Sequence, residues 1–403
     1  MMKIKKVISS SSRIKTIEYA IRDVVALASK LEQQGKPVTY LSIGDPPKYF
    51  ETPQHIREAL TNAINNGQSF YLDSLGLAEL REAVAEKENK INKIPISEED
   101  VLITSGVSEG ILFILAALID SKKKGDLLLP GPSYPPWLSY TKFFDGNPVE
   151  YKLDEENNWQ PDIDDIREKI TDQTSGILLL SPNNPVGVIY SEKHLKQIIN
   201  LAGEYQLPII TDEIYDRFTY DKKFVSIASL THVVPIIGLN GFSKAYLMTG
   251  WRLGYLYYSD PEYYLDELKE DINRMARIRL CAPGPSQVAA VAALRGPQDH
   301  IPEMMIQLRK RRDYTCKRLN ELDGIDCKVP DGAFYAFPRI ELGTRWKSDK
   351  DFVIDFLNQK QVLFVYGSGF GPKYGSGHFR VVYLAPEPIL KQAFDKLEDF
   401  LKK

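Results

Sequence analysis

From residue 100 onward, short runs of apolar residues alternate with longer stretches whose apolar residues recur at helical spacing. Runs that are apolar at nearly every position are typical of strands buried on both faces, as in parallel sheets. Strands that alternate with helices in this way predict a mostly parallel sheet with helices on both sides. The runs assigned to strands are DVLIT, DLLLP, GILLL, PIITDEIYD, VVPIIGL and RLGYLYYS.

The segments on either side of this region follow other patterns. Residues 1–45 resemble an amphipathic arm that ends in a short strand, and two helical patterns follow it. After residue 295 a long charged helix precedes a weaker mixture of strands and helices, which indicates a smaller α+β domain. Because 403 residues exceed the size of a single core, we predict two domains. Residues 51–295 form the large one, residues 296–403 form the small one, and residues 1–50 are an arm that contributes to the small domain.

Polar residues follow the predicted strands at the points where the strands end. In open α/β sheets, ligands bind in the crevice outside the carboxyl ends of the strands. These residues, although scattered in sequence, are therefore predicted to converge on one rim. They are Ser105, Tyr134, Asn184, Asp212 and Lys244.

Composition and charge narrow the possible classes of function. A hydrophobic content of 43% with 26% charged residues fits a folded soluble protein. The formal net charge of -3 gives no electrostatic reason to expect nucleic acid or an anionic membrane as a partner. Three cysteines without metal-ligand spacing predict a reduced, cytoplasmic protein that has no metal site. The start MMKIKKVISSSS lacks the apolar stretch of a secretory signal, and the run Ile111–Ile119 is too short to span a membrane.

The stretch NGFSKAYLMTGWRLGY places Lys244 and Arg252 among apolar residues. Charged side chains are rarely buried without a partner, so either these two are surface residues with apolar neighbours or an anionic, electrophilic ligand lies between them. An aldehyde cofactor that carries a phosphate and a pyridine ring meets this requirement. Lysine forms an imine with such an aldehyde, and burial lowers its pKa towards nucleophilic competence. Asp212 is expected to keep the ring nitrogen protonated.

Other residues at the same strand ends complete this interpretation. Tyr215 and Asn184 are placed to hydrogen-bond the phenolic oxygen of the ring, and Tyr134 to stack on its face. Arg252, Ser243 and the backbone of the TSGVS turn supply donors for a phosphate. Each motif alone has an ordinary interpretation as a surface lysine, a turn, a helix cap or a packing residue. Their occurrence together, in order, favours a cofactor site. The segment GSGFGPKYGSG matches no nucleotide-binding pattern and is interpreted as a flexible loop.

The motifs SPNNPVG, TDEIY and NGFSKAYLMTGWRLGY, in this order and spacing, resemble those of the class I aminotransferases, which are pyridoxal phosphate enzymes of fold type I. The resemblance extends from LSIGDPP through YLDSLGLAELREAV and PGPSYPPW to HFRVVYLAP. It implies an α/β fold whose large domain holds pyridoxal 5'-phosphate on a mostly parallel sheet, with a smaller α+β domain. It also implies an enzyme that transfers amino groups.

The resemblance further implies roles for individual residues. Lys244 resembles the catalytic lysine, which binds the cofactor covalently and carries the substrate proton. Tyr71 in FYLDSLG resembles the tyrosine that reaches the cofactor phosphate of the neighbouring subunit, which implies a homodimer. The full cofactor-binding set implied is Gly106, Val107, Ser108, Tyr134, Asn184, Asp212, Tyr215, Ser243, Lys244, Arg252 and Tyr71.

Substrate-binding roles are implied for three residues. Arg380 in HFRVVYL resembles the arginine that clamps the substrate α-carboxylate, Gly44 resembles a glycine whose backbone lines the substrate, and Asn184 is implied to bind substrate as well as cofactor. At one position the sequence departs from the family pattern, because Gly241 stands where many relatives have a serine that donates to the phosphate. This departure places more of the phosphate binding on Ser243 and Arg252.

Three segments resemble the bacterial and archaeal alanine aminotransferases: IEYAIRDVV, NWQPDIDDIREKIT and RMARIRLCAPGPSQVAA. They imply that L-alanine and 2-oxoglutarate react to give pyruvate and L-glutamate. The residue that grips the distal carboxylate of glutamate is left open among Arg22, Arg277 and Arg279. Other donors, such as aspartate, aromatic amino acids or kynurenine, remain alternatives. So do a pyridoxal phosphate lyase or synthase and a non-catalytic regulator on the same fold.

Overall fold

The structure is a computed structural model that describes residues 9–120 and 122–402. Residues 1–8, Ser121 and Lys403 lie outside the described residues. The start of the predicted N-terminal arm, and most of the segment used to argue against a secretory signal, therefore also lie outside them.

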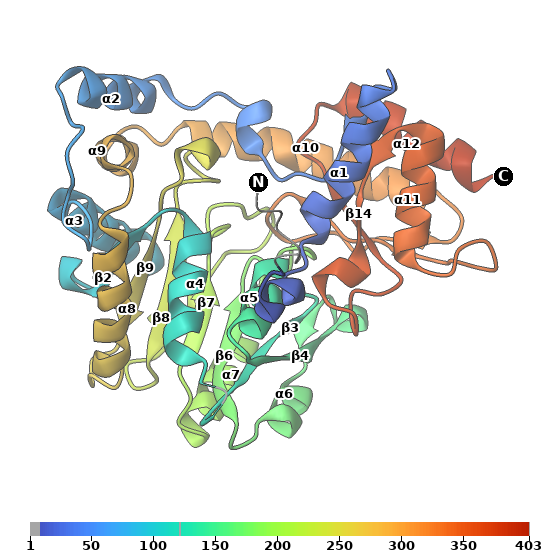
Figure 1. Cartoon of the computed structure of the whole chain (residues 1–403). Helices are drawn as coiled ribbons and strands as arrows, with labels where there is room; N and C mark the ends of the chain where they lie inside the picture. The colour runs from blue at the N-terminus through green and yellow to red at the C-terminus, as the bar shows by residue number, and fades with distance from the viewer. Residues whose placement is uncertain (1–8, 121, 403) are drawn as a thin grey trace, which may run out of the picture.

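An eight-stranded sheet forms the centre of the molecule, in the order β2-β9-β8-β7-β6-β3-β4-β5 (Figure 1). Strands β3, β4, β6, β7 and β8 run parallel to one another, whereas β9 is antiparallel to both β2 and β8, and β5 is antiparallel to β4. The predicted mostly parallel α/β architecture is confirmed. The strands are β2 Val101–Thr104, β3 Asp126–Gly131, β4 Asn147–Asp154, β5 Gln160–Pro161, β6 Thr174–Leu180, β7 Ile209–Asp212, β8 Ile236–Gly241 and β9 Gly254–Ser259.

Alternate residues of the central strands enter two different cores. In β6, Leu178 and Leu180 belong to the cluster that contains Ile111 of α4, whereas Ile177 and Leu179 belong to the cluster that contains Ile198 of α7. Because both faces are buried, the strand is apolar at successive positions. Figure 1 shows α4 and α8 in front of the sheet. The flanking helices are α4 Val107–Leu118, α5 Pro135–Phe143, α6 Ile163–Lys169, α7 Glu192–Glu204 and α8 Asp266–Arg279.

Three further helices pack together beside β2, where α9 contacts both α2 and α3 (Figure 1). They are α2 Gln54–Asn65, α3 Ala78–Lys87 and α9 Gly284–Arg295. Helix α3 continues directly into a π-helical turn, Glu88–Asn92. Strand β4 was not predicted, because it lies near the sheet edge and is apolar at only some positions.

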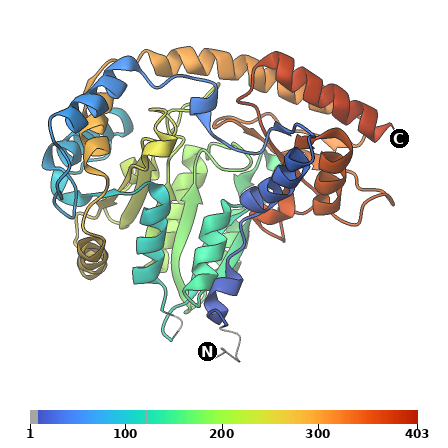
Figure 2. The same cartoon turned by 45° about the horizontal axis from the view of Figure 1, so that its top comes forward.

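The second region combines both ends of the chain. Near the N-terminus, α1 Ala20–Gln33 packs on α11 Asp349–Lys360, and β1 Thr39–Tyr40 pairs in parallel with β13 Val362–Leu363. Helix α10 His300–Asn320 bridges the two regions in both views (Figures 1 and 2). The remaining elements are β10 Ile325–Asp326, β11 Tyr335–Ala336, β12 Arg339–Ile340, β14 Val365–Tyr366, β15 Phe379–Val382 and α12 Glu387–Leu401. The domain limits at residues 50 and 295 stay predictions.

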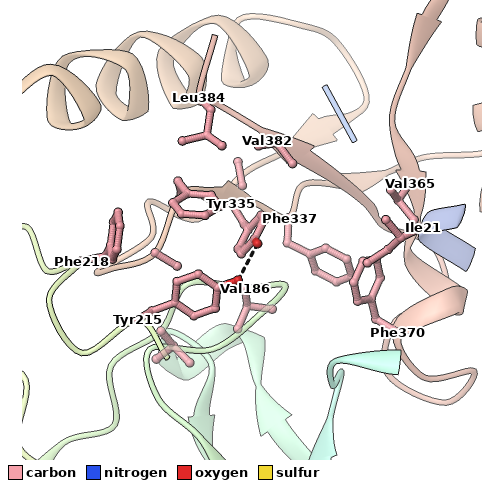
Figure 3. Packing of buried hydrophobic residues seen from close by; sticks show 14 of the residues in the cluster. Ile21, Val186, Tyr215, Phe218, Tyr335, Phe337, Val365, Phe370, Val382 and Leu384 are labelled. Carbon is pink, nitrogen blue, oxygen red and sulfur yellow. Dashed lines mark hydrogen bonds between the residues drawn. The ribbon is translucent and has the colours of Figure 1, made fainter. Parts of the chain in front are cut away.

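A continuous aromatic and aliphatic core joins the two regions. Tyr215 and Phe218, from the loop after β7, pack against Phe334 and Tyr335 with ring centroids 5.3–5.6 Å apart. Figure 3 shows the Tyr215 and Tyr335 hydroxyls pointing toward each other, with Ile21 of α1 at the far side of the cluster. These contacts fix the loop after β7 relative to the C-terminal region.

Some features are absent from residues 9–120 and 122–402. No helix there has both the length and the apolar character needed to cross a membrane. Those residues also contain no group of three or more His, Cys, Asp or Glu side chains placed to hold a metal ion.

Candidate active site

A cavity of about 580 Å³ opens at the carboxyl ends of the parallel strands. Four of the five strand-end residues predicted to converge line this cavity, while Ser105 presents its carbonyl oxygen 3.5 Å from Arg252 Nη2. The predicted site residues that line the cavity are Gly44, Val107, Ser108, Tyr134, Asn184, Asp212, Tyr215, Ser243, Lys244, Arg252 and Arg380.

Lys244 follows strand β8 and points its amine across the cavity. Its Nζ donates to the carbonyl oxygen of Gly44 at 2.7 Å and lies 5.8 Å from the centre of the Phe334 ring. Burial lowers the pKa of Lys244 to about 8; Asp45 opposes this shift, and Arg380 and Arg252 add to it. A substantial fraction of the amine is therefore neutral near physiological pH, as a nucleophile requires.

Asp212 ends strand β7 and is 4% exposed. Its carboxylate accepts hydrogen bonds from Trp137 Nε1 and from the backbone N–H of Ile214, both at 3.3 Å. Burial raises the pKa of Asp212 to about 6, against the effect of these donors and of Lys244. A buried carboxylate with two long hydrogen bonds fits a protonated ring nitrogen, which would supply the missing positive charge.

Arg380 on β15 is 1% exposed and has no ion pair within the described chain. Its Nη1 donates to Asn184 Oδ1 at 2.8 Å, and its Nη2 donates to the carbonyl oxygen of Ser42 at 2.6 Å. The guanidinium lies 4.5 Å from the centre of the Tyr335 ring, and its Nε has no hydrogen-bond partner. A buried cation without a counter-ion is suited to an incoming carboxylate.

The part of the cavity near Arg252 and the start of α4 has features that favour an anion. Gly106 (φ +82°) precedes helix α4, whose first residues, Val107 and Ser108, line the cavity. A Cβ on Gly106 would lie 2.5 Å from Arg252 Nη2, so only glycine allows the arginine this close to the turn. Arg252 is exposed and donates from Nη1 to the carbonyl oxygen of Thr249 at 3.0 Å. A helix N-terminus beside an arginine is a favourable position for a phosphate.

Gly241 lies where two strands of the sheet approach closely. A Cβ at this position would lie 2.9 Å from the Cα of Gly254 on the neighbouring strand β9. A serine at this position would force β8 and β9 apart, so the close packing of these strands requires glycine.

Three residues that contact side chains of the cavity lining were not identified from the sequence. Trp137 orients Asp212 from 75 positions away, Tyr335 donates to or accepts from Tyr215 at 2.6 Å, and Tyr19 makes the same kind of contact with Tyr134 at 3.2 Å. Trp137 and Tyr19 stand in segments that the resemblance had singled out, PGPSYPPW and IEYAIRDVV. Nothing in their local pattern indicates which side chain they meet.

The remaining predicted residues lie at or outside the cavity wall. Tyr71 is 78% exposed and is not among the residues that line the cavity. Of the three arginines considered for a distal carboxylate, only Arg22 lines the cavity. Arg277 pairs with Glu270 at 2.7 Å on the surface, and Arg279 pairs with Glu109 at 2.8 Å.

The residues present fit pyridoxal phosphate at each of its functional groups. Lys244 is placed for the aldehyde, Asp212 for the ring nitrogen, and Tyr215 and Asn184 for the phenolic oxygen. The turn before α4, with Arg252 and Ser243, is placed for the phosphate.

Comparison with known proteins gives a consistent result. The family described as "Aminotransferase class I and II" matches residues 36–397. The glutamate-pyruvate aminotransferase AlaA of Escherichia coli (strain K12) is 36% identical, over 98% of this chain and 98% of that one. The aromatic-amino-acid aminotransferase 2 of Thermococcus litoralis is also 36% identical, over 95% of each chain. The solved structure of an alanine aminotransferase from Pyrococcus furiosus is 52% identical, with a TM-score of 0.95 over 98% of this chain and 100% of that chain.

Proposed function

The chain belongs to the class I and II aminotransferase family, and we propose that it uses pyridoxal 5'-phosphate to exchange the amino group between L-alanine and 2-oxoglutarate, giving pyruvate and L-glutamate. Aminotransferase activity follows from the family. The choice of substrates is supported by similarity to proteins named alanine aminotransferase and glutamate-pyruvate aminotransferase.

One observation carries this proposal. Three residues with unusual properties face one cavity. Lys244 has a lowered pKa, Asp212 is a buried carboxyl group, and Arg380 is a buried arginine without a counter-ion among the described residues. An electrophilic aldehyde, a ring nitrogen and a substrate carboxylate are the three groups that such a set would bind together.

When bound, the cofactor supplies an electron-accepting ring and a carbon that stores the amino group between the two half-reactions. Arg380 orients the amino acid through its α-carboxylate, in a direction fixed by Asn184 and the carbonyl of Ser42. Lys244 Nζ would accept the proton from the substrate Cα and hold it for delivery to the cofactor, a role suited to its pKa of about 8. Asp212 holds the proton on the ring nitrogen, and Trp137 fixes the carboxylate that does so.

Arg22 is proposed to bind the distal carboxylate of glutamate and 2-oxoglutarate. It lies on α1, lines the cavity, and has no ion pair within residues 9–120 and 122–402. Because alanine and pyruvate have no second carboxylate, the same cavity would serve both substrate pairs, with Arg22 engaged in only one of them.

A homodimer is proposed from an exposed apolar patch that includes Tyr71. Phe70 is 61% exposed, and on the neighbouring segment Ile278 is 86% and Leu280 is 49% exposed. The two segments are adjacent, since the backbone N–H of Leu72 donates to Cys281 Sγ at 3.4 Å. A second copy of the chain that covers this patch would bury these side chains. Tyr71 of each copy would then approach the cavity of the other copy.

A transamination assay across amino donors, with pyruvate and 2-oxoglutarate as acceptors, tests the proposal. Alanine is expected to give the highest kcat/KM with 2-oxoglutarate. A higher value for aromatic donors would favour the activity named for the Thermococcus relative, and release of ammonia would indicate a lyase. The Lys244→Ala variant is expected to lose turnover. The wild type should carry a yellow chromophore that borohydride fixes to the protein.

A further inference from the structure

Helix α8 ends with an unusual placement of side chains. Ile278 and Leu280 are 86% and 49% exposed, while the Arg279 side chain between them is only 13% exposed. Exposed apolar residues around a largely buried cation reverse the usual preference, which indicates that Arg279 is held inside by specific contacts.

Those contacts come from three separate segments. Arg279 Nη1 donates to Glu109 Oε2 at 2.8 Å, and Nη2 donates to the carbonyl oxygens of Ser74 at 3.0 Å and Ile103 at 3.2 Å. Its guanidinium also lies 5.8 Å from the centre of the Phe113 ring. Arg279 therefore links the end of β2 and the loop before α3 to the first turn of α4.

Glu109 connects Arg279 to the turn at the proposed phosphate end of the cavity. The same oxygen, Oε2, accepts the backbone N–H of Ser105 at 2.8 Å, directly before Gly106 and the start of α4. The carboxylate therefore holds the turn that leads into Val107 and Ser108, which line the cavity. Left unpaired, its negative charge would also oppose an anion at the same helix N-terminus.

We propose that Arg279 is a positioning residue for the cofactor phosphate. It neutralises Glu109 in the first turn of α4 and, through that carboxylate, fixes the Ser105 turn against which the phosphate binds. This inference rests on the proposed use of pyridoxal phosphate, and it assigns Arg279 a role other than gripping a substrate carboxylate.

Titration of the full-length, cofactor-free protein with pyridoxal phosphate and with pyridoxal, which lacks the phosphate, tests the inference. By analogy with groups that orient metal ligands, Arg279→Met is expected to weaken the affinity for pyridoxal phosphate about 10- to 100-fold. The affinity for pyridoxal should stay within about twofold of the wild-type value, because the aldehyde and ring contacts are untouched. Arg274→Met, which removes an exposed arginine of the same helix that pairs, within the described residues, only with its helical neighbours, is the matched control and should bind both compounds as the wild type does.

The double variant Glu109→Gln with Arg279→Met separates charge compensation from general damage. Glutamine still accepts the Ser105 N–H but carries no charge, so most of the lost affinity for pyridoxal phosphate should return. Arg279→Lys keeps the charge but lacks the planar guanidinium. Its affinity for pyridoxal phosphate should lie between those of the wild type and Arg279→Met.

Three results would overturn the inference. The first is an unchanged affinity of Arg279→Met for pyridoxal phosphate, and the second is an equal loss of affinity for pyridoxal phosphate and pyridoxal. The third is a double variant that binds pyridoxal phosphate as weakly as Arg279→Met does. If Arg279→Met does not fold, the lysine and double variants provide the same comparison. A wild type that binds neither compound would instead refute the proposed function.

Discussion

Arg380 Nη1 donates a hydrogen bond to Asn184 Oδ1 at 2.8 Å, although the two residues are 196 positions apart in the chain. The bond joins β15, in the C-terminal region, to the loop that follows β6 of the central sheet. Because it connects the proposed carboxylate clamp to a proposed cofactor ligand, it aligns the substrate with the cofactor across the junction of the two regions.

Arg380→Lys is expected to raise KM for every amino donor. A lysine keeps the charge but cannot bond both Asn184 and the Ser42 carbonyl while it also meets a carboxylate in two places. Loss of a charge-assisted hydrogen bond of about 1.5–3 kcal/mol corresponds to roughly 10- to 100-fold in kcat/KM. Steady-state kinetics across the donor panel measure this change. An effect confined to one donor would assign Arg380 to a side-chain pocket instead.

The pKa of about 8 predicts how the rate of cofactor loading depends on pH. Only the neutral amine of Lys244 attacks an aldehyde, so the loading rate of the cofactor-free protein should rise with pH and level off above about pH 8. A lysine with its ordinary pKa of about 10.4 would give a rate that still rises at pH 9. Stopped-flow absorbance at constant ionic strength follows the reaction, and a rise that persists to pH 10 contradicts the prediction.

Arg22→Met is expected to separate the two substrate pairs. KM for glutamate and 2-oxoglutarate should rise about tenfold or more, because each loses a charge-assisted contact to its distal carboxylate. KM for alanine and pyruvate should change by less than about twofold, because they have no group for Arg22 to bind. The unaffected pair serves as the internal control. Equal changes for all four substrates would show that Arg22 supports the cavity without recognising a carboxylate.

Glu213→Gln is expected to flatten the pH dependence of folding stability. Glu213 is 1% exposed and accepts hydrogen bonds from Ser226 at 2.7 Å and Thr211 at 3.1 Å. Burial, with a further contribution from the Glu88 carboxylate, raises the pKa of Glu213 from 4.5 to about 8. Between these values the folded protein holds a proton that the unfolded chain releases, so the stability from this group falls as pH rises.

Urea unfolding of both proteins, repeated between pH 5 and pH 8.5, measures that difference. The free energy of unfolding of the wild type should decline relative to that of Glu213→Gln across this range and then run parallel to it above about pH 8. Parallel curves throughout would mean that Glu213 is ionised in the folded state.

The motifs allowed much of the site to be predicted before the fold was known. The family resemblance and the mostly parallel sheet are confirmed, and eleven predicted residues line one cavity. This was possible because strands buried on both faces are apolar throughout, so the polar residues that end them, such as Asp212 and Lys244, stand out. The residue roles and the homodimer stay predictions, which the experiments above address.

The sequence by itself determined six of the eight strands of the central sheet, all except β4 and β5, and the residue types at their ends, because both are recorded in local periodicity. Only the tertiary structure decided which of the three arginines considered for the distal carboxylate lies at the cavity, that Trp137 meets Asp212, and that Arg279 meets Glu109. These pairs depend on strand order, register and the path of the chain. A residue's neighbours in sequence do not specify its partner when that partner is 75 or 170 positions away.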